Sequence, residues 1–323
     1  MTLMSYGEAV VDALYTSMKE DPTVTLIWGS LTGVGGQSPL VAKIKEEFSD
    51  RILHPPISEA GMAGIAAGAA MSGLRPILPF GTASFMLRAW DQIVHEAGSV
   101  HYMSNGKARA PIVFHGVHGL RGGGGPQHSL SPQAMLWNNP GIEIVLPSSP
   151  ADARGLLRSA IRSNNPTVVL DHQRLTKVEG DVPEGDFIVP FGRADIKRDG
   201  KDITIVAASL QVKAAILAAE ELVSEGIDLE VIDLRSLVPL DEETILQSVA
   251  KTGRLIVADE TPMRCSIASE VIATVCEKGL DFLKSPPVRI NRRHGHIPTN
   301  LAMEEHGLPS VQRIVAAAKS LAV

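Results

Sequence analysis

Short runs of continuous apolar residues alternate with longer helical patterns along this chain of 323 residues. Such runs indicate parallel strands that are buried on both faces, because a strand with one solvated face alternates apolar and polar residues. In the first half, strands are predicted at 25–27, 76–78, 112–115, 142–146 and 167–170, and helices at 5–19, 39–48, 59–72, 86–102 and 150–162. This order predicts an α/β fold with helices on both faces of a parallel sheet.

A change of composition divides the chain. Residues 177–201 are charged and rich in turn residues, which is typical of a linker. Beyond it, strands are predicted at 203–207, 229–232, 255–257 and 288–290, and helices at 211–224, 241–249, 266–278 and 311–321. We therefore expect two three-layer α/β domains, residues 1–180 and 201–323, joined by a linker at 181–200.

Composition argues against several classes of protein. A net charge of −6 with scattered Lys and Arg argues against nucleic acid as the main partner. The sequence lacks an apolar run of about 18 residues that could span a membrane, and no secretory signal is visible at the N-terminus. Cys265 and Cys276 do not support a disulfide framework, so we expect a reducing compartment, the cytoplasm or, for a processed chain, the mitochondrial matrix.

Residues 55–73 contain a single carboxylate at the start of a helix made almost wholly of Ala, Gly and Met. Ser58 can cap the first turn of this helix, and Gly73 can end it. An acid at a helix start is often stabilised only by the helix dipole. However, we expect the residues that follow to be buried, and a carboxylate among them needs a partner or must become neutral. Glu59 is therefore a candidate site residue.

Gly61, Gly64 and Gly68 recur at helical spacing in the same segment, so that one face of the helix has almost no side chains. Each glycine inside a helix costs up to about 1 kcal/mol relative to alanine. This cost predicts a contact in which another backbone approaches the glycine face closely.

Two further segments stand out. Four consecutive glycines, 122–125, precede His128, which could act there as a proton shuttle or oxyanion donor. The alternative is a mobile surface loop with an incidental histidine, and we also expect a solvated loop around His294 and His296. Phe85 could be an aromatic platform for a heterocycle or a core residue.

The sequence has no recognisable diphosphate-binding motif. The glycine-rich stretch at 33–37 lacks the spacing of a dinucleotide-binding loop, and no Gly-Lys-Ser/Thr follows the glycines at 122–125. A Gly-Asp-Gly with paired Asn further along, the usual holder of a magnesium diphosphate, is also missing.

Taken together, these segments resemble the β subunit of the decarboxylase component of 2-oxoacid dehydrogenase complexes, of the pyruvate, branched-chain 2-oxoacid and acetoin dehydrogenase type. The resemblance covers essentially the whole chain and is carried by residues 56–76, 90–94, 102–104, 123–129, 147–157 and 231–241. It implies a thiamine diphosphate fold, with a pyrimidine-binding domain followed by a transketolase C-terminal-like domain.

The resemblance also implies partners. Thiamine diphosphate would lie between this chain and an α subunit that supplies Mg²⁺ and the diphosphate grip, in an α2β2 heterotetramer. The glycine-faced helix would lie at a close subunit contact, and the chain alone would be inactive. The substrate would be a 2-oxoacid that loses carbon dioxide, and the acyl group would pass to the lipoyl group of an acyltransferase component.

Four residues take site roles by resemblance. Glu59 would hydrogen-bond the cofactor's pyrimidine ring and promote the imino tautomer that accepts the thiazolium proton. Phe85 would pack against the pyrimidine, close to Arg88, which stands where many relatives carry Gln. His128 would assist substrate binding or acyl transfer.

The chain departs from the family pattern in places. Related β subunits hold potassium largely through backbone carbonyls, and the matching positions here are Ile112, Ala160, Ile161, Ser163 and Asn165. Ser163 stands where an acid is usual. Trp28-Gly29-Ser30 replaces a Gly-Glu-Asp stretch, and Leu170-Asp171-His172-Gln173 replaces Phe-Glu-His-Lys. These changes leave the substrate open.

Three alternatives remain beside the 2-oxoacid dehydrogenase. An acetoin- or acyloin-type dehydrogenase would be distinguished by substrate trials. A transketolase-like subunit would not reduce a lipoyl domain. A non-catalytic docking subunit would retain full activity in its assembly after Glu59→Ala.

Overall fold

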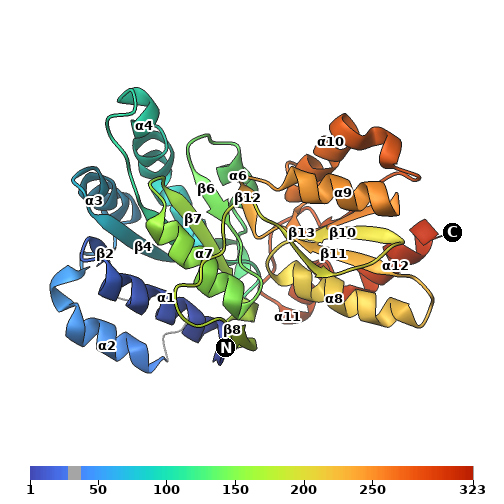
Figure 1. Ribbon diagram of the computed structural model, residues 1–323, viewed down its shortest axis with the longest axis horizontal. Coiled ribbons are helices and arrows are strands. Elements are labelled where there is room, and N and C mark those ends of the chain that lie inside the picture. Colours follow the sequence, from blue (N-terminus) through green and yellow to red (C-terminus); the bar gives the residue numbers. More distant parts are fainter. Residues whose placement is uncertain (28–37, 323) are drawn as a thin grey trace. The chain divides into compact units, whose positions relative to one another are not determined.

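The computed structural model describes residues 1–27 and 38–322 (Figure 1). The chain forms two compact units, residues 1–121 with 127–191, and residues 122–126 with 192–323. The departure at Trp28, Gly29 and Ser30 and the glycine-rich stretch at 33–37 lie outside the described residues.

The first unit contains a parallel sheet with the strand order β6-β7-β5-β4-β2-β3. Its strands are β2 (Val24–Ile27), β3 (Ile52–Leu53), β4 (Arg75–Thr82), β5 (Val113–His118), β6 (Glu143–Val145) and β7 (Thr167–His172). Every residue of β5 and β7 is buried, as the continuous apolar runs predicted.

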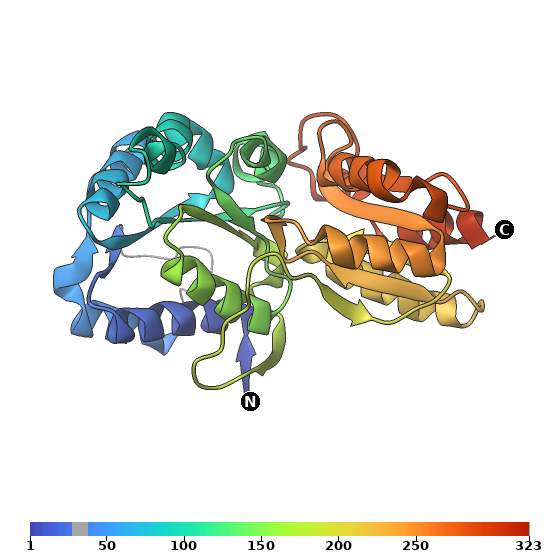
Figure 2. The same ribbon diagram turned by 45° about the horizontal axis from the view of Figure 1, so that its top comes forward.

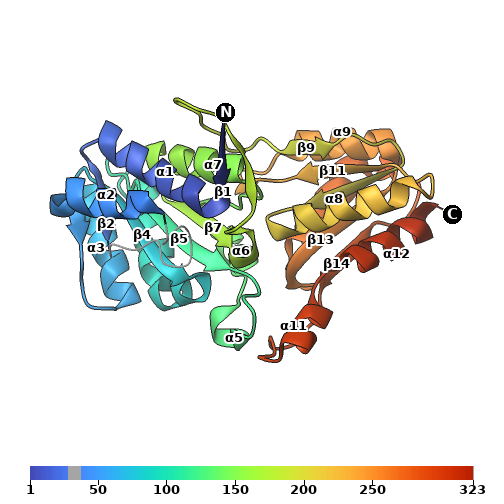
Figure 3. The same cartoon turned by 90° about the horizontal axis from the view of Figure 1, so that it is seen from below.

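Helices cover both faces of this sheet, which confirms the predicted fold class. Figure 3 shows α1 (Tyr6–Glu20) and α7 (Pro150–Arg162) side by side on one face and α3 (Glu59–Met71) on the other. α2 (Pro39–Glu47) packs beside α1. Ser58 caps α3 by accepting a hydrogen bond from the Gly61 N–H, and Gly73 follows the helix with a φ of 100°. Both ends of α3 therefore match the prediction.

The predicted helix at 86–102 is replaced by three shorter elements. They are the 3-10 helix η2 (Ala83–Ala89), the π-helix η3 (Gln92–Ala97) and α4 (Val100–Met103). In η2 the side chains of Ala83, Met86 and Ala89 are buried. This spacing suits a 3-10 helix, which has about three residues per turn, better than an α-helix. Tertiary packing therefore decided the type of helix here.

A small antiparallel pair of strands was not predicted from the sequence. β1 (Thr2–Ser5) pairs with β8 (Glu179–Val182), as Figure 2 shows near the N-terminus. The residues of β8 are mostly polar, as in a linker, and β1, with which β8 pairs, lies at the other end of the first unit's sequence. Other short helical elements are η1 (Ser49–Arg51), α5 (Gly125–His128), α6 (Gln133–Trp137) and η4 (Gln173–Leu175).

The second unit contains a sheet with the order β14-β13-β10-β11-β9, in which only the pairing of β9 with β11 is antiparallel among the described strands. Its strands are β9 (Asp195–Arg198), β10 (Ile203–Ala207), β11 (Leu229–Asp233), β13 (Leu255–Pro262) and β14 (Val288–Arg292). β9 falls inside the segment predicted as a linker. β12 (Ser236–Val238) is a further short strand of this part of the chain.

Helices also enclose the second sheet in two layers. α8 (Leu210–Val223) and α12 (Val311–Ala322) lie on one face, and α9 (Glu242–Thr252) and α10 (Ile267–Gly279) lie on the other (Figure 1). The aliphatic core is formed largely by β10, β11, α8 and α12. Two short elements, η5 (Leu280–Phe282) and α11 (Leu301–Gly307), follow α10 and β14. No helix in the described part of the chain is long and apolar enough to cross a membrane.

Candidate active site

Glu59 lies in the first turn of α3 with only one charged neighbour among the described residues. Its side chain is 14% exposed, and one carboxylate oxygen lies 3.4 Å from the Arg88 Nε. The Arg88 side chain is 71% exposed, so solvent screens this ion pair strongly. A ligand that hydrogen-bonds Glu59 could therefore replace Arg88 at little cost.

The burial of α3 differs from the expectation. Its alanine face is buried, through Ala63, Ala66, Ala67 and Ala70, but its opposite face is not. A Cβ added at Gly68 would meet nothing within 4 Å, and one at Gly64 would meet only Gln92, at 3.9 Å. At Gly64 and Gly68 the glycine face therefore makes no close contact within the described chain, whereas a Cβ at Gly61 would lie 3.0 Å from the Ser58 hydroxyl oxygen of the helix cap.

Phe85 and Arg88 lie on η2, which packs against α3, β4 and β5. Residues three apart lie on the same side of a 3-10 helix, so that these two side chains share a face. The Phe85 ring meets the His128 ring edge to face, with centroids 5.4 Å apart. The Ser84 hydroxyl donates to the Gln127 carbonyl at 2.5 Å, which ties η2 to the segment that carries His128. η2 thus connects all four predicted site residues.

The glycine run before His128 is held in place rather than loose. The N–H groups of Gly122 and Gly123 donate to the two carboxylate oxygens of Glu304, at 2.9 Å and 2.5 Å. Glu304 lies in α11 and is almost fully buried. Gly122, Gly123 and Gly125 all have positive φ, the conformation that glycine adopts at least cost. These hydrogen bonds argue against the alternative of a mobile surface loop at residues 122 and 123.

A second group of polar side chains lies at the carboxyl ends of three neighbouring parallel strands. Arg121 follows β5 and donates to the Thr82 hydroxyl at 2.6 Å and to the Gln173 side-chain carbonyl at 3.2 Å. Thr82 ends β4, and Gln173 follows β7. In open α/β sheets, ligands bind at this edge of the strands.

Comparison with known proteins identifies the family. Residues 3–178 match the family model described as transketolase, pyrimidine binding domain, and residues 192–314 match transketolase, C-terminal domain. The chain is 38% identical over 326 residues to the β subunit of acetoin:2,6-dichlorophenolindophenol oxidoreductase of Cupriavidus necator, covering 98% of this chain and 96% of that protein. The chain belongs to the family of 2-oxoacid dehydrogenase-type β subunits.

Two other similarities support this family assignment. The chain is 38% identical over 315 residues to the pyruvate dehydrogenase E1 β subunit of Rickettsia felis, covering 97% of each. A solved structure titled split gene transketolase, inactive beta4 tetramer, matches its fold with a TM-score of 0.81 at 24% identity, covering 99% of this chain and 98% of that one. The predicted family and fold are confirmed, and a pyrimidine-binding domain of this family implies thiamine diphosphate as the cofactor.

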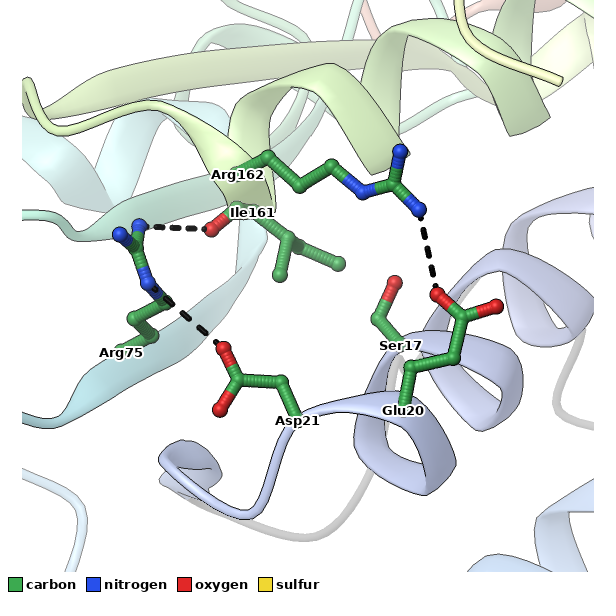
Figure 4. Close-up of a pocket in the computed structure, with 6 residues that line it drawn as sticks. All are labelled: Ser17, Glu20, Asp21, Arg75, Ile161 and Arg162. Carbon is green, nitrogen blue, oxygen red and sulfur yellow. Dashed lines mark hydrogen bonds and ion pairs between the residues drawn. The ribbon is translucent and has the colours of Figure 1, made fainter. Parts of the chain in front are cut away.

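The family positions predicted to hold potassium lie elsewhere in the first unit. Figure 4 shows a cavity of about 300 Å³ lined by Ser17, Glu20, Asp21, Arg75, Ile161 and Arg162. Arg75 donates to the carbonyls of Ile161 and Ser163 at 3.1 Å and 2.7 Å. A potassium ion held by these two carbonyls would lie beside a guanidinium, and like charges repel.

The other predicted potassium positions also have partners. The Ile112 carbonyl accepts from the Thr167 N–H, and the Ala160 carbonyl accepts from the Ser163 N–H. The Ser163 hydroxyl and the Asn165 side-chain amide donate to the carboxylate of Glu143. These residues fit a hydrogen-bonded network closed by Arg75 better than they fit an ion.

The unusual stretch at 170–173 divides into core and site residues. Asp171 is buried, accepts a hydrogen bond from the Tyr6 hydroxyl at 2.5 Å and lies 2.6 Å from the His115 Nε2. His172 packs edge to face on His118, with ring centroids 5.1 Å apart. Gln173 contacts Arg121 at the strand ends. Of the residues that depart from the family pattern, Asp171 is therefore part of the core, and Gln173 lies next to the candidate site.

Sequence reasoning missed Arg121, Gln173 and Glu304 as site residues. Gln173 lay in a stretch already marked as unusual, but Arg121 and Glu304 gave no signal of their own. Glu304 is followed by a second glutamate and has the pattern of a solvated helix. The described residues contain no group of three or more His, Cys, Asp or Glu placed to hold a metal ion.

Proposed function

We propose that this chain is the β subunit of a thiamine diphosphate-dependent 2-oxoacid dehydrogenase of the acyl-transferring kind. The observation that carries the proposal is the gathering of Glu59, Phe85 and His128 around η2, in a chain of this family. A carboxylate at a helix start, an aromatic ring and a histidine suit the binding of an aminopyrimidine and the chemistry beside it.

Thiamine diphosphate, when bound, supplies a nucleophilic carbon and an electron sink for the decarboxylation. In this chain, Glu59 would hold or move a proton at the pyrimidine ring nitrogen. Phe85 would pack against the ring and orient it. The Arg88 guanidinium lies 3.4 Å from a Glu59 carboxylate oxygen, so Arg88 would have to swing aside for this carboxylate to hydrogen-bond the pyrimidine ring.

His128 would act on the substrate side of the site. An imidazole can accept and donate protons, and the contact of His128 with Phe85 fixes the ring relative to η2. The proton would be exchanged with the oxygen of the substrate carbonyl or with the lipoyl sulfur that leaves as a thiolate when the other sulfur takes the acyl group and the S–S bond breaks.

The second subunit would be an α subunit that contributes Mg²⁺ and the diphosphate site. Large apolar side chains are exposed near the glycine face of α3, and exposed apolar groups of this kind mark subunit contacts. They are Ile57, which is 72% exposed, and Ile65, Met71 and Leu74. We propose an α2β2 assembly, a lipoyl acyltransferase as the acyl acceptor and the bacterial cytoplasm as the location. We give potassium no role, since Arg75 already binds two of the carbonyls.

Thiamine diphosphate binding, measured by calorimetry, tests the proposal. The chain alone should bind the cofactor weakly, and the chain co-expressed with its α subunit should bind it tightly and only with Mg²⁺. Glu59→Ala should weaken binding strongly, whereas Glu46→Ala, at an exposed acid of α2, should not change it. Tight binding by the isolated chain, or full activity of the Glu59→Ala assembly, would overturn the proposal.

An acetoin-type dehydrogenase is the second candidate, because the chain is equally identical, at 38%, to an acetoin oxidoreductase subunit and to a pyruvate dehydrogenase subunit. Turnover of acetoin but of no 2-oxoacid would favour it. Ketol transfer without reduction of a lipoyl domain would instead favour a transketolase-like activity.

A further inference from the structure

Arg121 is anchored at both sides by neutral groups. One terminal nitrogen donates to the Thr82 hydroxyl, and the other donates to the Gln173 side-chain carbonyl. Thr82 is buried and is the last residue of β4. β4 pairs with β5, and Arg121 follows β5 along the chain. The guanidinium is therefore held across the carboxyl ends of β4 and β7 with a defined orientation.

No acid among the described residues compensates the charge of Arg121. Its hydrogen-bond partners are a hydroxyl and an amide, and it forms no ion pair in the part of the chain that the structure describes. The nearest acid along β7, Asp171, is occupied by Tyr6 and His115. Burial lowers the pKa of the Arg121 guanidinium from its ordinary value, and no neighbouring carboxylate opposes this shift.

A partly buried cation without a counter-charge is costly for the fold and favours an anion. The two arginines of this unit that are buried, Arg154 and Arg158, both have acids. Arg154 pairs with Asp12 at 2.6 Å, and Arg158 pairs with Glu20 and Asp186. The difference indicates that the counter-ion of Arg121 comes from a ligand.

We propose that Arg121 is a specificity-determining residue that binds a carboxylate of the substrate, and that it selects an anionic 2-oxoacid over a neutral acyloin such as acetoin. This inference rests on the proposed function and names the substrate class of that site. The guanidinium fork matches a planar carboxylate in two parallel hydrogen bonds, which neutral acetoin cannot form.

The role is in binding rather than in the chemical step. A carboxylate that leaves as carbon dioxide loses its charge on the way to the transition state. An ion pair to this carboxylate therefore stabilises the bound substrate at least as much as it stabilises the transition state. Removing Arg121 should therefore raise KM for 2-oxoacids and leave kcat nearly unchanged. A charge-assisted hydrogen bond predicts a rise of about 10- to 100-fold.

The test compares variants in the assembly with the α subunit. KM and kcat are measured for pyruvate, 2-oxoisovalerate and acetoin, with dichlorophenolindophenol as electron acceptor. Arg121→Gln should raise KM for both 2-oxoacids but not for acetoin, and Arg121→Lys should restore part of the loss. Arg264→Gln, at an exposed arginine of the second unit, is the charge-matched control and should change nothing.

A second variant keeps Arg121 and neutralises it in place. Gln173→Glu would put a carboxylate on the same guanidinium nitrogen, so it should also raise KM for 2-oxoacids selectively. This variant guards against misfolding of Arg121→Gln. Saturation-transfer NMR with pyruvate and acetoin makes the same comparison by binding, without turnover.

Each other outcome overturns the inference. Equal changes for pyruvate and acetoin would mean that Arg121 is structural. A matching loss of thiamine diphosphate affinity would mean that it binds the cofactor. If the wild-type assembly does not bind thiamine diphosphate at all, the proposed function fails and this inference fails with it. If cofactor binding is normal and only the KM pattern is wrong, the function stands.

Discussion

Glycine serves opposite purposes in two segments of this chain. In α3 the glycines lie on a face that touches little, and a Cβ at Gly68 would have open space around it. In the run before His128, Gly122 and Gly123 have positive φ and donate to a buried carboxylate, and a Cβ at Gly123 would lie 3.0 Å from the Thr299 carbonyl. The glycine face of α3 is therefore largely uncovered in this chain, whereas Gly122 and Gly123 already contact other residues of the chain.

What a glycine does in this chain depends on the residues that surround it. In the helix, glycine was expected to allow another backbone to approach closely. In the loop, the glycines were expected to present His128, with a mobile surface loop as the alternative. Within this chain the loop has the close contact. The helix keeps its empty face for the partner subunit that we propose. Substitutions in both segments test this distinction.

The largest effect is expected at Gly123. Gly123→Ala adds a methyl group at positive φ and against the Thr299 carbonyl, so we expect a loss of about 1–3 kcal/mol of local stability. Hydrogen exchange of the Gly122 and Gly123 amides should speed up accordingly. Gly226→Ala is the matched control, because Gly226 has a φ of 75° but open space around it, and it should lose less, about 1 kcal/mol. Equal losses at the two sites would show that the contact with Thr299 contributes nothing.

A middle effect is expected at Glu304. Glu304→Gln turns one of the two acceptor oxygens into a donor that faces a backbone N–H, which should cost about 1–3 kcal/mol at the loop. The assembly should retain its thiamine diphosphate affinity but lose catalytic rate if the glycine run positions His128. Glu277→Gln, at an exposed acid of α10, is the control. Unchanged amide exchange at Gly122 and Gly123 would contradict the anchoring role.

The smallest effect, with the opposite sign, is expected at Gly68. Gly68→Ala fills no occupied space in the chain and should raise the stability of the isolated chain by about 0.5–1 kcal/mol in thermal or denaturant unfolding. In the assembly the same methyl group should weaken the association with the partner. Stabilisation of chain and assembly by the same amount would show that no subunit packs closely on this face.

Much of the fold follows from local patterns. The helix predicted at 59–72 is observed as Glu59–Met71, with the predicted cap at Ser58, because capping and helical periodicity act within a few residues. The buried strands were predicted for the same reason. The edge strand β9 and the pair of β1 with β8 were not, since polar short strands have no pattern of their own and depend on a distant partner.

The candidate site was predictable in part. Glu59, Phe85 and His128 were singled out by unusual local composition and by family resemblance. Their arrangement around η2 was not, because the burial of Ala83, Met86 and Ala89 turned a predicted α-helix into a 3-10 helix that sets Phe85 and Arg88 on one face.

The α/β class, the family and the acid that begins α3 could all be predicted from the sequence, since each is written in short-range patterns or motifs. Which charges have partners became clear only from the three-dimensional arrangement. Glu304 meets Gly122 from 182 positions away, and Arg121 meets Gln173 from 52 positions away. A charge needs a partner within a few ångströms in space, and separation along the chain does not reveal that distance. That Arg121 faces a hydroxyl and an amide, and no acid among the described residues, therefore becomes visible only once the strands are placed side by side.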